Sequence, residues 1–165
     1  MTTLQRFLDY NLWANARLSE NIASVPSSSI EQLPLAPFGS IHETLRHVIG
    51  AENIWLDRIM GQSPTNFLAI TEGRTLDELR EMLVDISGRW VEYASAGSET
   101  ANIFSVDGVI TYSTTKGDVF EQAIPDVVLH MVNHSTYHRG QVMSALRSVY
   151  DGRLSALDLI VFTRE

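Results

Sequence analysis

The stretch HMVNHSTYHRGQV, residues 130–142, holds three of the five histidines in this chain of 165 residues. They are His130, His134 and His138, and their spacing of four residues places them along one side of a helix. Eight helical residues rise ~12 Å, whereas the ligand atoms around zinc each lie ~2 Å from the metal. At most two adjacent rings of this helix can therefore bind one ion directly.

The apolar residues around this stretch indicate which two rings face the interior. At ~100° per residue they form one stripe along the helix. Its members are Val127, Met131, Val142, Ala145 and Val149. His134 and His138 fall inside this stripe, whereas His130 and Tyr137 lie at its edge. Two neutral imidazoles one turn apart can share a metal ion, with a third ligand from another helix. The alternative is a pair of hydrogen-bonded core histidines.

Periodicity and capping signals predict four long helices along the chain. Their expected ranges are residues 2–25, 41–60, 76–96 and 125–150. Ser40 with Glu43, and Thr75 with Glu78, form capping-box patterns at the start of the second and third helices. Pro125 suits the first turn of the fourth helix.

The segment between the third and fourth helices has a different composition. Residues 103–124, IFSVDGVITYSTTKGDVFEQAI, are rich in β-branched and aromatic residues and are broken by Gly108 and Gly117. This pattern predicts two or three short strands, which should pack on the helices because a lone hairpin is marginally stable. Residues 155–162, SALDLIVF, predict a short closing helix. We therefore expect an all-α fold: one domain over residues 1–165, a four-helix bundle with a β-hairpin insert and a short C-terminal helix.

The composition narrows the range of partners. Hydrophobic residues make up 44% of the chain and charged residues 19%, which is typical of a globular protein. The net charge is −8 and no two basic residues are adjacent, so we expect no nucleic-acid partner. No apolar run reaches ~18 residues, so we expect no membrane span. The absence of cysteine excludes thiolate metal sites and, with an N-terminus unlike a signal peptide, favours the cytoplasm.

Polar residues also interrupt the apolar stripe of the first helix. Asn11 and Asn15 lie within it, between Leu8 and Leu18. A buried amide without a partner costs ~1–3 kcal/mol, so both should meet polar groups across the bundle. Together with the histidines they suggest a shared polar pocket, and simple hydrogen bonds between helices are the alternative.

The second helix contains the other two histidines, His42 and His47. His42-Glu43 begins like a zinc-protease HExxH motif, but the next histidine comes one residue late, ~100° around the helix, so that motif is excluded. The apolar stripe of this helix consists of Leu45, Val48, Ile49 and Leu56. The phase of His47 relative to this stripe predicts the outer face of the helix, and periodicity does not select it as a ligand.

Three stretches of the chain resemble the DinB/YfiT-like family of small metal-binding helical bundles. They are DYNLWANARL (residues 9–18), LRHVIGAENIWLDRI (residues 45–59) and LHMVNHSTYHRGQV (residues 129–142). The resemblance implies a metal site made by His47, His134 and His138, which overrules the phase argument on His47. It also implies zinc or nickel as the usual metal, and a homodimer. Trp13, opposite the core stripe of its helix, is a candidate dimer contact or is covered by a neighbouring segment.

A site of three imidazoles with open positions is typical of catalytic rather than structural metal centres. The residues expected behind the ligands or in a substrate pocket are Asn11, Asn15, His130, Tyr137, Arg139 and Gln141. The resemblance favours a metal-dependent enzyme acting on a small molecule, such as a transferase that uses a low-molecular-weight thiol. The alternatives are a metallohydrolase, with Glu52 as general base, and a non-catalytic, stress-related module that binds a metal or small ligand.

Overall fold

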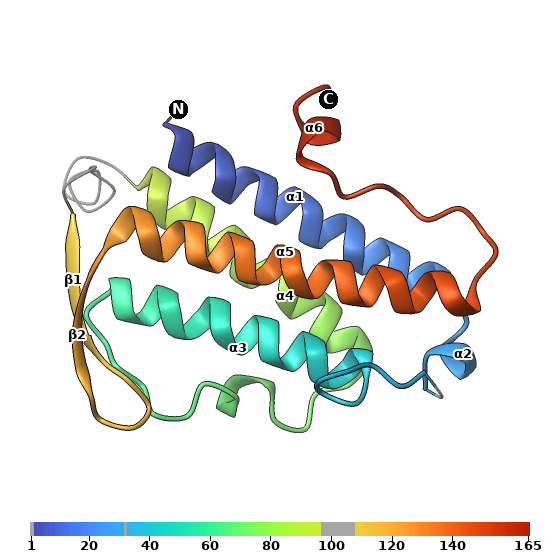
Figure 1. The fold of residues 1–165 in the computed structure, drawn as a ribbon, viewed down its shortest axis with the longest axis horizontal. Helices are drawn as coiled ribbons and strands as arrows, with labels where there is room; N and C mark the ends of the chain where they lie inside the picture. Colours follow the sequence, from blue (N-terminus) through green and yellow to red (C-terminus); the bar gives the residue numbers. More distant parts are fainter. Residues whose placement is uncertain (1, 32, 97–107) are drawn as a thin grey trace.

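The computed structural model describes residues 2–31, 33–96 and 108–165 and shows a four-helix bundle (Figure 1). The long helices are α1 (Thr3–Ser24), α3 (Ile41–Ile59), α4 (Leu76–Ser95) and α5 (Ile124–Val149). Each matches its predicted range to within one residue at each end. Helix α1 packs against α4 and α5, and α3 packs against the same two helices. The predicted fold class is confirmed.

The direction of the helices determines how they are connected. In Figure 1, α1 and α5 run one way and α3 and α4 run the other, so the chain between α3 and α4 returns along the length of the bundle. This return segment, residues 60–75, contains a short 3-10 helix, η1 (Ala69–Thr71), which packs on α3. It approaches α3 closely at Gly50, where a Cβ atom would lie 2.5 Å from the carbonyl oxygen of Phe67. Glycine at this position therefore allows the return segment to lie on the helix.

The capping signals are confirmed fully at α4 and partly at α3. Thr75 and Glu78 form both hydrogen bonds of a capping box. At α3 the side chain of Ser40 accepts a hydrogen bond from the backbone amide of Glu43. The carboxylate of Glu43 turns instead to the guanidinium of Arg46, at 2.9 Å, so the reciprocal bond is not made.

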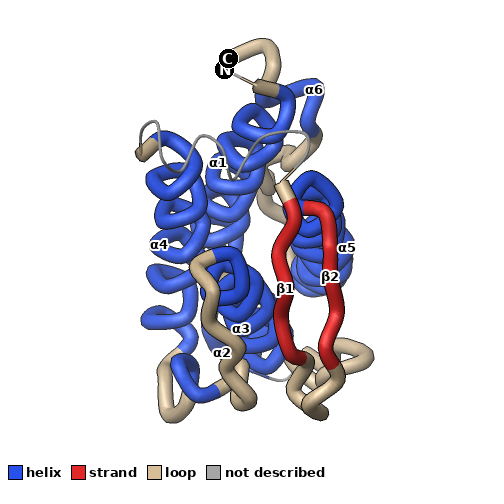
Figure 2. The backbone as a smooth tube through the Cα atoms, turned by 90° about the vertical axis from the view of Figure 1, so that its left-hand side faces the viewer, coloured by secondary structure: helices blue, strands red, loops and turns tan. Residues whose placement is uncertain are grey.

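The predicted insert is an antiparallel hairpin of β1 (Val109–Ser113) and β2 (Val119–Ala123), which leads directly into α5 (Figure 2). Tyr112 of β1 packs edge-on against Trp55 of α3, with ring centres 5.1 Å apart. The hairpin is thereby fastened to the bundle, as expected for so small a sheet. Residues 103–107 of the predicted strand segment lie outside the described residues.

The two ends of the bundle differ from the sequence prediction. The connector after α1 contains an unpredicted short helix, α2 (Ser27–Glu31), and the closing helix α6 is shorter than predicted (Leu159–Phe162). Residues 155–157 run extended along α1 instead. The backbone of Ser155 pairs with the amide of Asn21, at 2.8 and 3.0 Å, and the Tyr10 hydroxyl donates to the carbonyl of Leu157 at 2.9 Å. Because side chains of α1 satisfy this backbone, it does not need to be helical.

The same C-terminal segment covers Trp13. The indole Nε1 donates to the carboxylate of Glu165 at 2.9 Å, and the ring packs against Phe162 with centres 5.6 Å apart. The sequence suggested either a dimer contact at Trp13 or cover by a neighbouring segment. The structure shows Trp13 covered by the C-terminal segment of the same chain.

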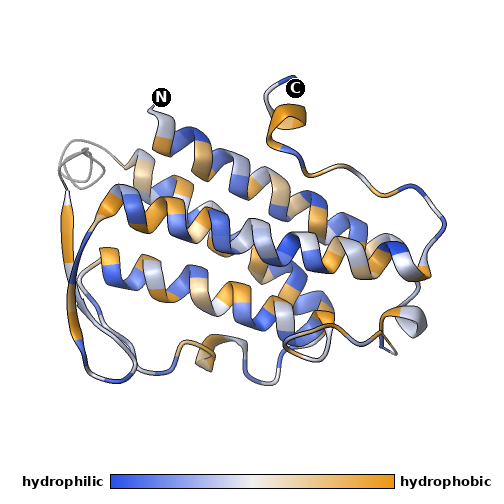
Figure 3. Ribbon diagram, viewed as in Figure 1, coloured by the Kyte–Doolittle hydropathy of each residue, from blue (hydrophilic) through white to orange (hydrophobic). Residues whose placement is uncertain are grey.

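The interior is mainly apolar, and many of its buried polar side chains lie near its centre. Figure 3 shows the middle of α5 as a largely hydrophilic stretch, which corresponds to NHSTYHRGQ, residues 133–141. Ser135, His138 and Arg139 of this stretch are nevertheless buried. Val149 was predicted in the core and is 38% exposed, in the last turn of α5. Within the described residues, no helix is long and apolar enough to cross a bilayer.

Replacing Gly50 by alanine should lower the free energy of unfolding by ~1–3 kcal/mol, because the new methyl group forces the backbone at Phe67 to move. Gly88 of α4 is the matched control, since a Cβ there meets nothing within 4 Å and alanine favours a helix by ~1 kcal/mol. Urea denaturation of both variants measures the difference. Equal stabilities for Gly50→Ala and Gly88→Ala would contradict close packing of the return segment.

Candidate metal centre

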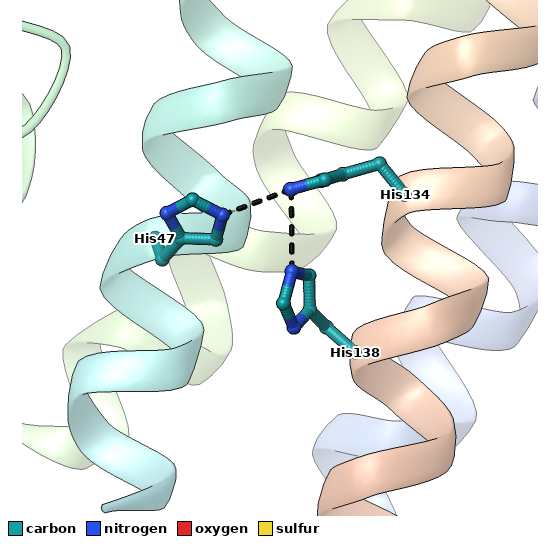
Figure 4. A group of neighbouring side chains, drawn as sticks. All are labelled: His47, His134 and His138. Carbon is teal, nitrogen blue, oxygen red and sulfur yellow. Dashed lines mark hydrogen bonds between the residues drawn. The ribbon is translucent and has the colours of Figure 1, made fainter. Parts of the chain in front are cut away.

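Three histidines from two helices point toward one another in the structure (Figure 4). The Nε2 atom of His134 lies 2.9 Å from Nε2 of His47 and 3.2 Å from Nε2 of His138. One ligand atom from each of the three rings lies within 4.8 Å of the others. Helix α3 supplies His47, and α5 supplies the other two from consecutive turns.

His47 does not lie on the outer face of α3, so the position predicted from the helix phase is wrong. The ring is half-buried, because α3 contacts neighbours on more than the side that faces the core. Phe38, from the connector before α3, stacks on His47 with ring centres 4.3 Å apart, and Phe67 of the return segment packs edge-on at 5.9 Å. The sequence gives no signal for either phenylalanine, because both lie in loops, outside any helical periodicity.

A hydrogen bond determines which nitrogen of His138 faces the cluster. Nδ1 of His138 lies 2.7 Å from Oε1 of Gln141, one turn further along α5. A carbonyl oxygen only accepts, so Nδ1 bears the proton and Nε2 presents its lone pair to the cluster. Gln141 therefore holds His138 in the form that binds a metal.

The surroundings keep two of the rings neutral. Burial, together with the neighbouring His138, lowers the pKa of His47 from 6.5 to about 4. Burial also lowers the pKa of His134 to about 4, with further contributions from His138, His47 and His130. Both rings are uncharged at pH 7, and uncharged imidazole is the form that coordinates a cation.

The contacts among the three rings fit a metal better than they fit hydrogen bonding alone. A ring nitrogen of neutral imidazole offers either one hydrogen or one lone pair, so Nε2 of His134 cannot bond well to both neighbours. A divalent cation accepts a lone pair from each ring and removes this conflict. Tetrahedral zinc with Zn–N of ~2.0–2.1 Å separates its ligand nitrogens by ~3.3 Å. The two separations from Nε2 of His134 are 2.9 and 3.2 Å, and all three ligand atoms lie within 4.8 Å of one another.

Behind the histidines, Glu52 forms the centre of a buried polar network. Its side chain is fully buried. Oε1 accepts hydrogen bonds from Asn11 at 2.9 Å, Asn15 at 3.0 Å and Ser135 at 2.7 Å, and Oε2 accepts one from Ser87 at 2.9 Å. Its position in the apolar stripe of α3 was a signal in the sequence, but its partners come from three other helices.

Arg139 balances the charge of Glu52 through the two asparagines. Its Nη1 donates to the side-chain oxygens of Asn11 at 2.6 Å and Asn15 at 2.7 Å, and Nη2 donates to Thr136 at 2.7 Å. Each asparagine thus accepts from the arginine and donates to the glutamate. The two asparagines make the inter-helix hydrogen bonds that were one of the two sequence interpretations, and Arg139 lies with them in the interior.

Glu52 is poorly placed to act as the general base of a metallohydrolase. Both of its oxygens are engaged by the four donors of the network, and it has no exposed surface. Among the described residues, the group around the candidate metal position consists of the three histidines, without a carboxylate. This arrangement does not favour a metallohydrolase.

The remaining predicted residues lie beside the cluster. Tyr137 is 63% exposed, and its ring packs edge-on against His138 at 5.0 Å. Tyr137 and Gln141 also line an open hollow of about 560 Å³, together with residues 33–36 of the connector before α3. His130 is exposed, with its ring 6.0 Å from that of His134. The hollow therefore adjoins two residues that contact His138.

Replacing Glu52 by glutamine should lower the free energy of unfolding by ~3–5 kcal/mol. The new amide NH₂ group would face side chains that themselves donate hydrogen bonds, and the charge of Arg139 would be left unbalanced. Glu43→Gln on the same helix is the control. Its carboxylate pairs with Arg46 at a side-chain exposure of 43%, so the loss should stay below ~1 kcal/mol. Urea denaturation measures both, and similar small losses would show that the network contributes little.

The metal-free protein should lose stability as the pH falls from about 6.5 toward 4. In this range the unfolded chain protonates His47 and His134, whereas the folded protein does so only near their pKa of about 4. The free energy of unfolding, measured in urea from pH 7.5 to 4.5, should therefore decrease. His134→Gln should show a shallower decrease, and an unchanged slope in that variant would contradict the pKa assignment.

Comparison with known proteins places the chain in a family. The family model described as "DinB family" matches residues 1–149, a range that includes the three clustered histidines. Protein DinB of Bacillus subtilis (strain 168) is 22% identical over 149 residues, which cover 86% of this chain and 83% of that protein. The chain, with its four-helix bundle and a histidine cluster able to hold a metal ion, belongs to the DinB family.

Proposed function

We propose that the protein is a metal-dependent enzyme acting on a small molecule, and specifically a transferase that uses a low-molecular-weight thiol. The observation that carries this proposal is the set of three convergent ring nitrogens, a group that contains no carboxylate among the described residues. Three protein ligands leave positions around a zinc or nickel ion open to a substrate, as in catalytic centres.

The surrounding residues support binding of a small ligand. His47, His134 and His138 would hold the ion, which lowers the pKa of a thiol that binds to it. Gln141 orients His138, and Phe38 and Phe67 keep water from one flank of His47. The hollow beside Tyr137 offers room for the group that receives the sulfur.

The reaction we propose needs no further reactant. A carbon–sulfur bond forms between the thiol and an electrophilic carbon, and the leaving group departs with the electrons of its bond. The thiol proton goes to solvent. Since the chain contains no cysteine, the thiol must come from a small molecule.

Metal content is the first test of this proposal. Untagged protein purified without a nickel column should contain about one equivalent of a divalent metal by plasma mass spectrometry, and His138→Ala should contain little. His42→Ala is the matched control, because His42 lies on the same helix as His47 but bonds to Glu43 and the carbonyl of Arg74. The proposal would be refuted if the unsubstituted protein contained no metal and did not bind added zinc or nickel.

Turnover is the second part of the same test. With glutathione or 2-mercaptoethanol and chlorodinitrobenzene, the metal-loaded parent and His42→Ala should consume thiol faster than buffer does. A chelator or His138→Ala should abolish the excess rate. Stoichiometric metal binding without turnover on any thiol would favour a non-catalytic metal-binding module.

A further inference from the structure

Arg58, in the last turn of α3, is a buried arginine without an acidic partner among the described residues. It is 7% exposed, and its Nε is the one buried side-chain nitrogen or oxygen of the described part that has no hydrogen-bond partner. Nη2 reaches the carbonyl oxygen of Ser113 at 3.5 Å, the limit of a hydrogen bond. A guanidinium has five donors, and this long contact is the one hydrogen bond from Arg58 to a described protein group.

Two aromatic rings hold this guanidinium in place. Its central carbon lies 4.5 Å from the ring centres of both Trp55 and Tyr112, which meet edge-on. Cation–π contact stabilises the positive charge but leaves the N–H groups free. Burial lowers the pKa of Arg58, yet an arginine remains charged at neutral pH. The protein therefore maintains a fixed, partly desolvated positive charge with donors, Nε among them, that no described protein group occupies.

A planar guanidinium with free donors is suited to a carboxylate or phosphate. It can donate two parallel hydrogen bonds to either group, and partial burial strengthens them. The unpaired Nε contrasts with that of Arg80, whose Nε donates to the carbonyl of Ser19 at 2.9 Å. The unmet donors of Arg58 thus indicate a missing oxyanion.

A row of rings connects Arg58 with the three histidines. The Trp55 ring lies 5.5 Å from His130, and His130 lies 6.0 Å from His134. Along α3, His47 and Arg58 are separated by a rise of ~16 Å, which an extended small molecule can span. The first histidine of the stretch at residues 130–142 thus lies between the two ends of the row.

We propose that Arg58, positioned by Trp55 and Tyr112, binds the carboxylate or phosphate group of the small molecule whose reactive end lies at the three histidines. The placement of the reactive end rests on the proposed function, whereas anion binding at Arg58 does not. The competing explanation is that Arg58 only fastens the hairpin to α3.

The test is a titration followed at the Nε–H proton of Arg58 by nitrogen-15 NMR. Adding succinate or inorganic phosphate should shift this resonance in a saturable way, while sodium chloride at equal ionic strength should not. Arg58→Lys, which keeps the charge, assigns the resonance by its loss, and its remaining spectrum reports whether it folds. The Nε–H of Arg80 is the internal control and should not move. Saturation by one anion alone identifies its chemical class.

If neither succinate nor phosphate shifts the Arg58 resonance in a saturable way, the proposal is overturned. Arg58 then only holds the hairpin against α3. The same titration on His138→Ala separates the two proposals, because the shift should persist when the metal site is lost. In turnover assays, Arg58→Lys should raise KM for glutathione about tenfold with little change in kcat, since a charge-assisted hydrogen bond is weakened. It should leave KM for the uncharged 2-mercaptoethanol unchanged, and equal effects on both thiols would also overturn the spanning arrangement.

Discussion

The buried carboxylate of Glu52 is the constraint on which the rest of the structure depends. A charge in the interior is tolerated only when hydrogen bonds satisfy it and an opposite charge balances it. Here α1 provides Asn11 and Asn15, α4 provides Ser87, and α5 provides both Ser135 and Arg139. All four long helices therefore meet at one carboxylate. Apolar packing alone tolerates small rotations of a helix, whereas this network specifies one rotation for each of them.

The rotation of α5 links this network to the candidate metal centre. Ser135 and Arg139 each follow a clustered histidine by one residue, and the two histidine-containing pairs lie four residues apart. One residue of each pair faces Glu52 and its asparagines, and the other faces His47 across the α3–α5 contact. The interaction that satisfies the buried charge thus also aims His134 and His138. A metal site built on two such helices is held more firmly than one built on loops.

The connections between helices complete the surroundings of the site. The connector before α3 brings Phe38 onto His47, and the return segment brings Phe67 there because Gly50 allows its close approach. The hairpin brings Tyr112 beside Arg58, in the last turn of α3. The helices therefore supply the histidines, and the connections between the helices supply Phe38, Phe67 and Tyr112. This division explains why the contact between α3 and α5 combines candidate ligands, aromatic rings and an arginine that has no acidic partner within residues 2–31, 33–96 and 108–165.

The sequence by itself determined the ranges of the four long helices, the hairpin and the inward direction of His134 and His138, because periodicity, capping and turn signals act over a few neighbouring residues. It left the position of His47 to a family resemblance, since the phase of a helix describes its core face and not the contacts on its flanks. Only the tertiary structure decided the partners of Glu52, the loop phenylalanines at His47 and the extended path of residues 155–157. These features depend on groups far apart in the chain, and their energies become favourable only when four helices pack together.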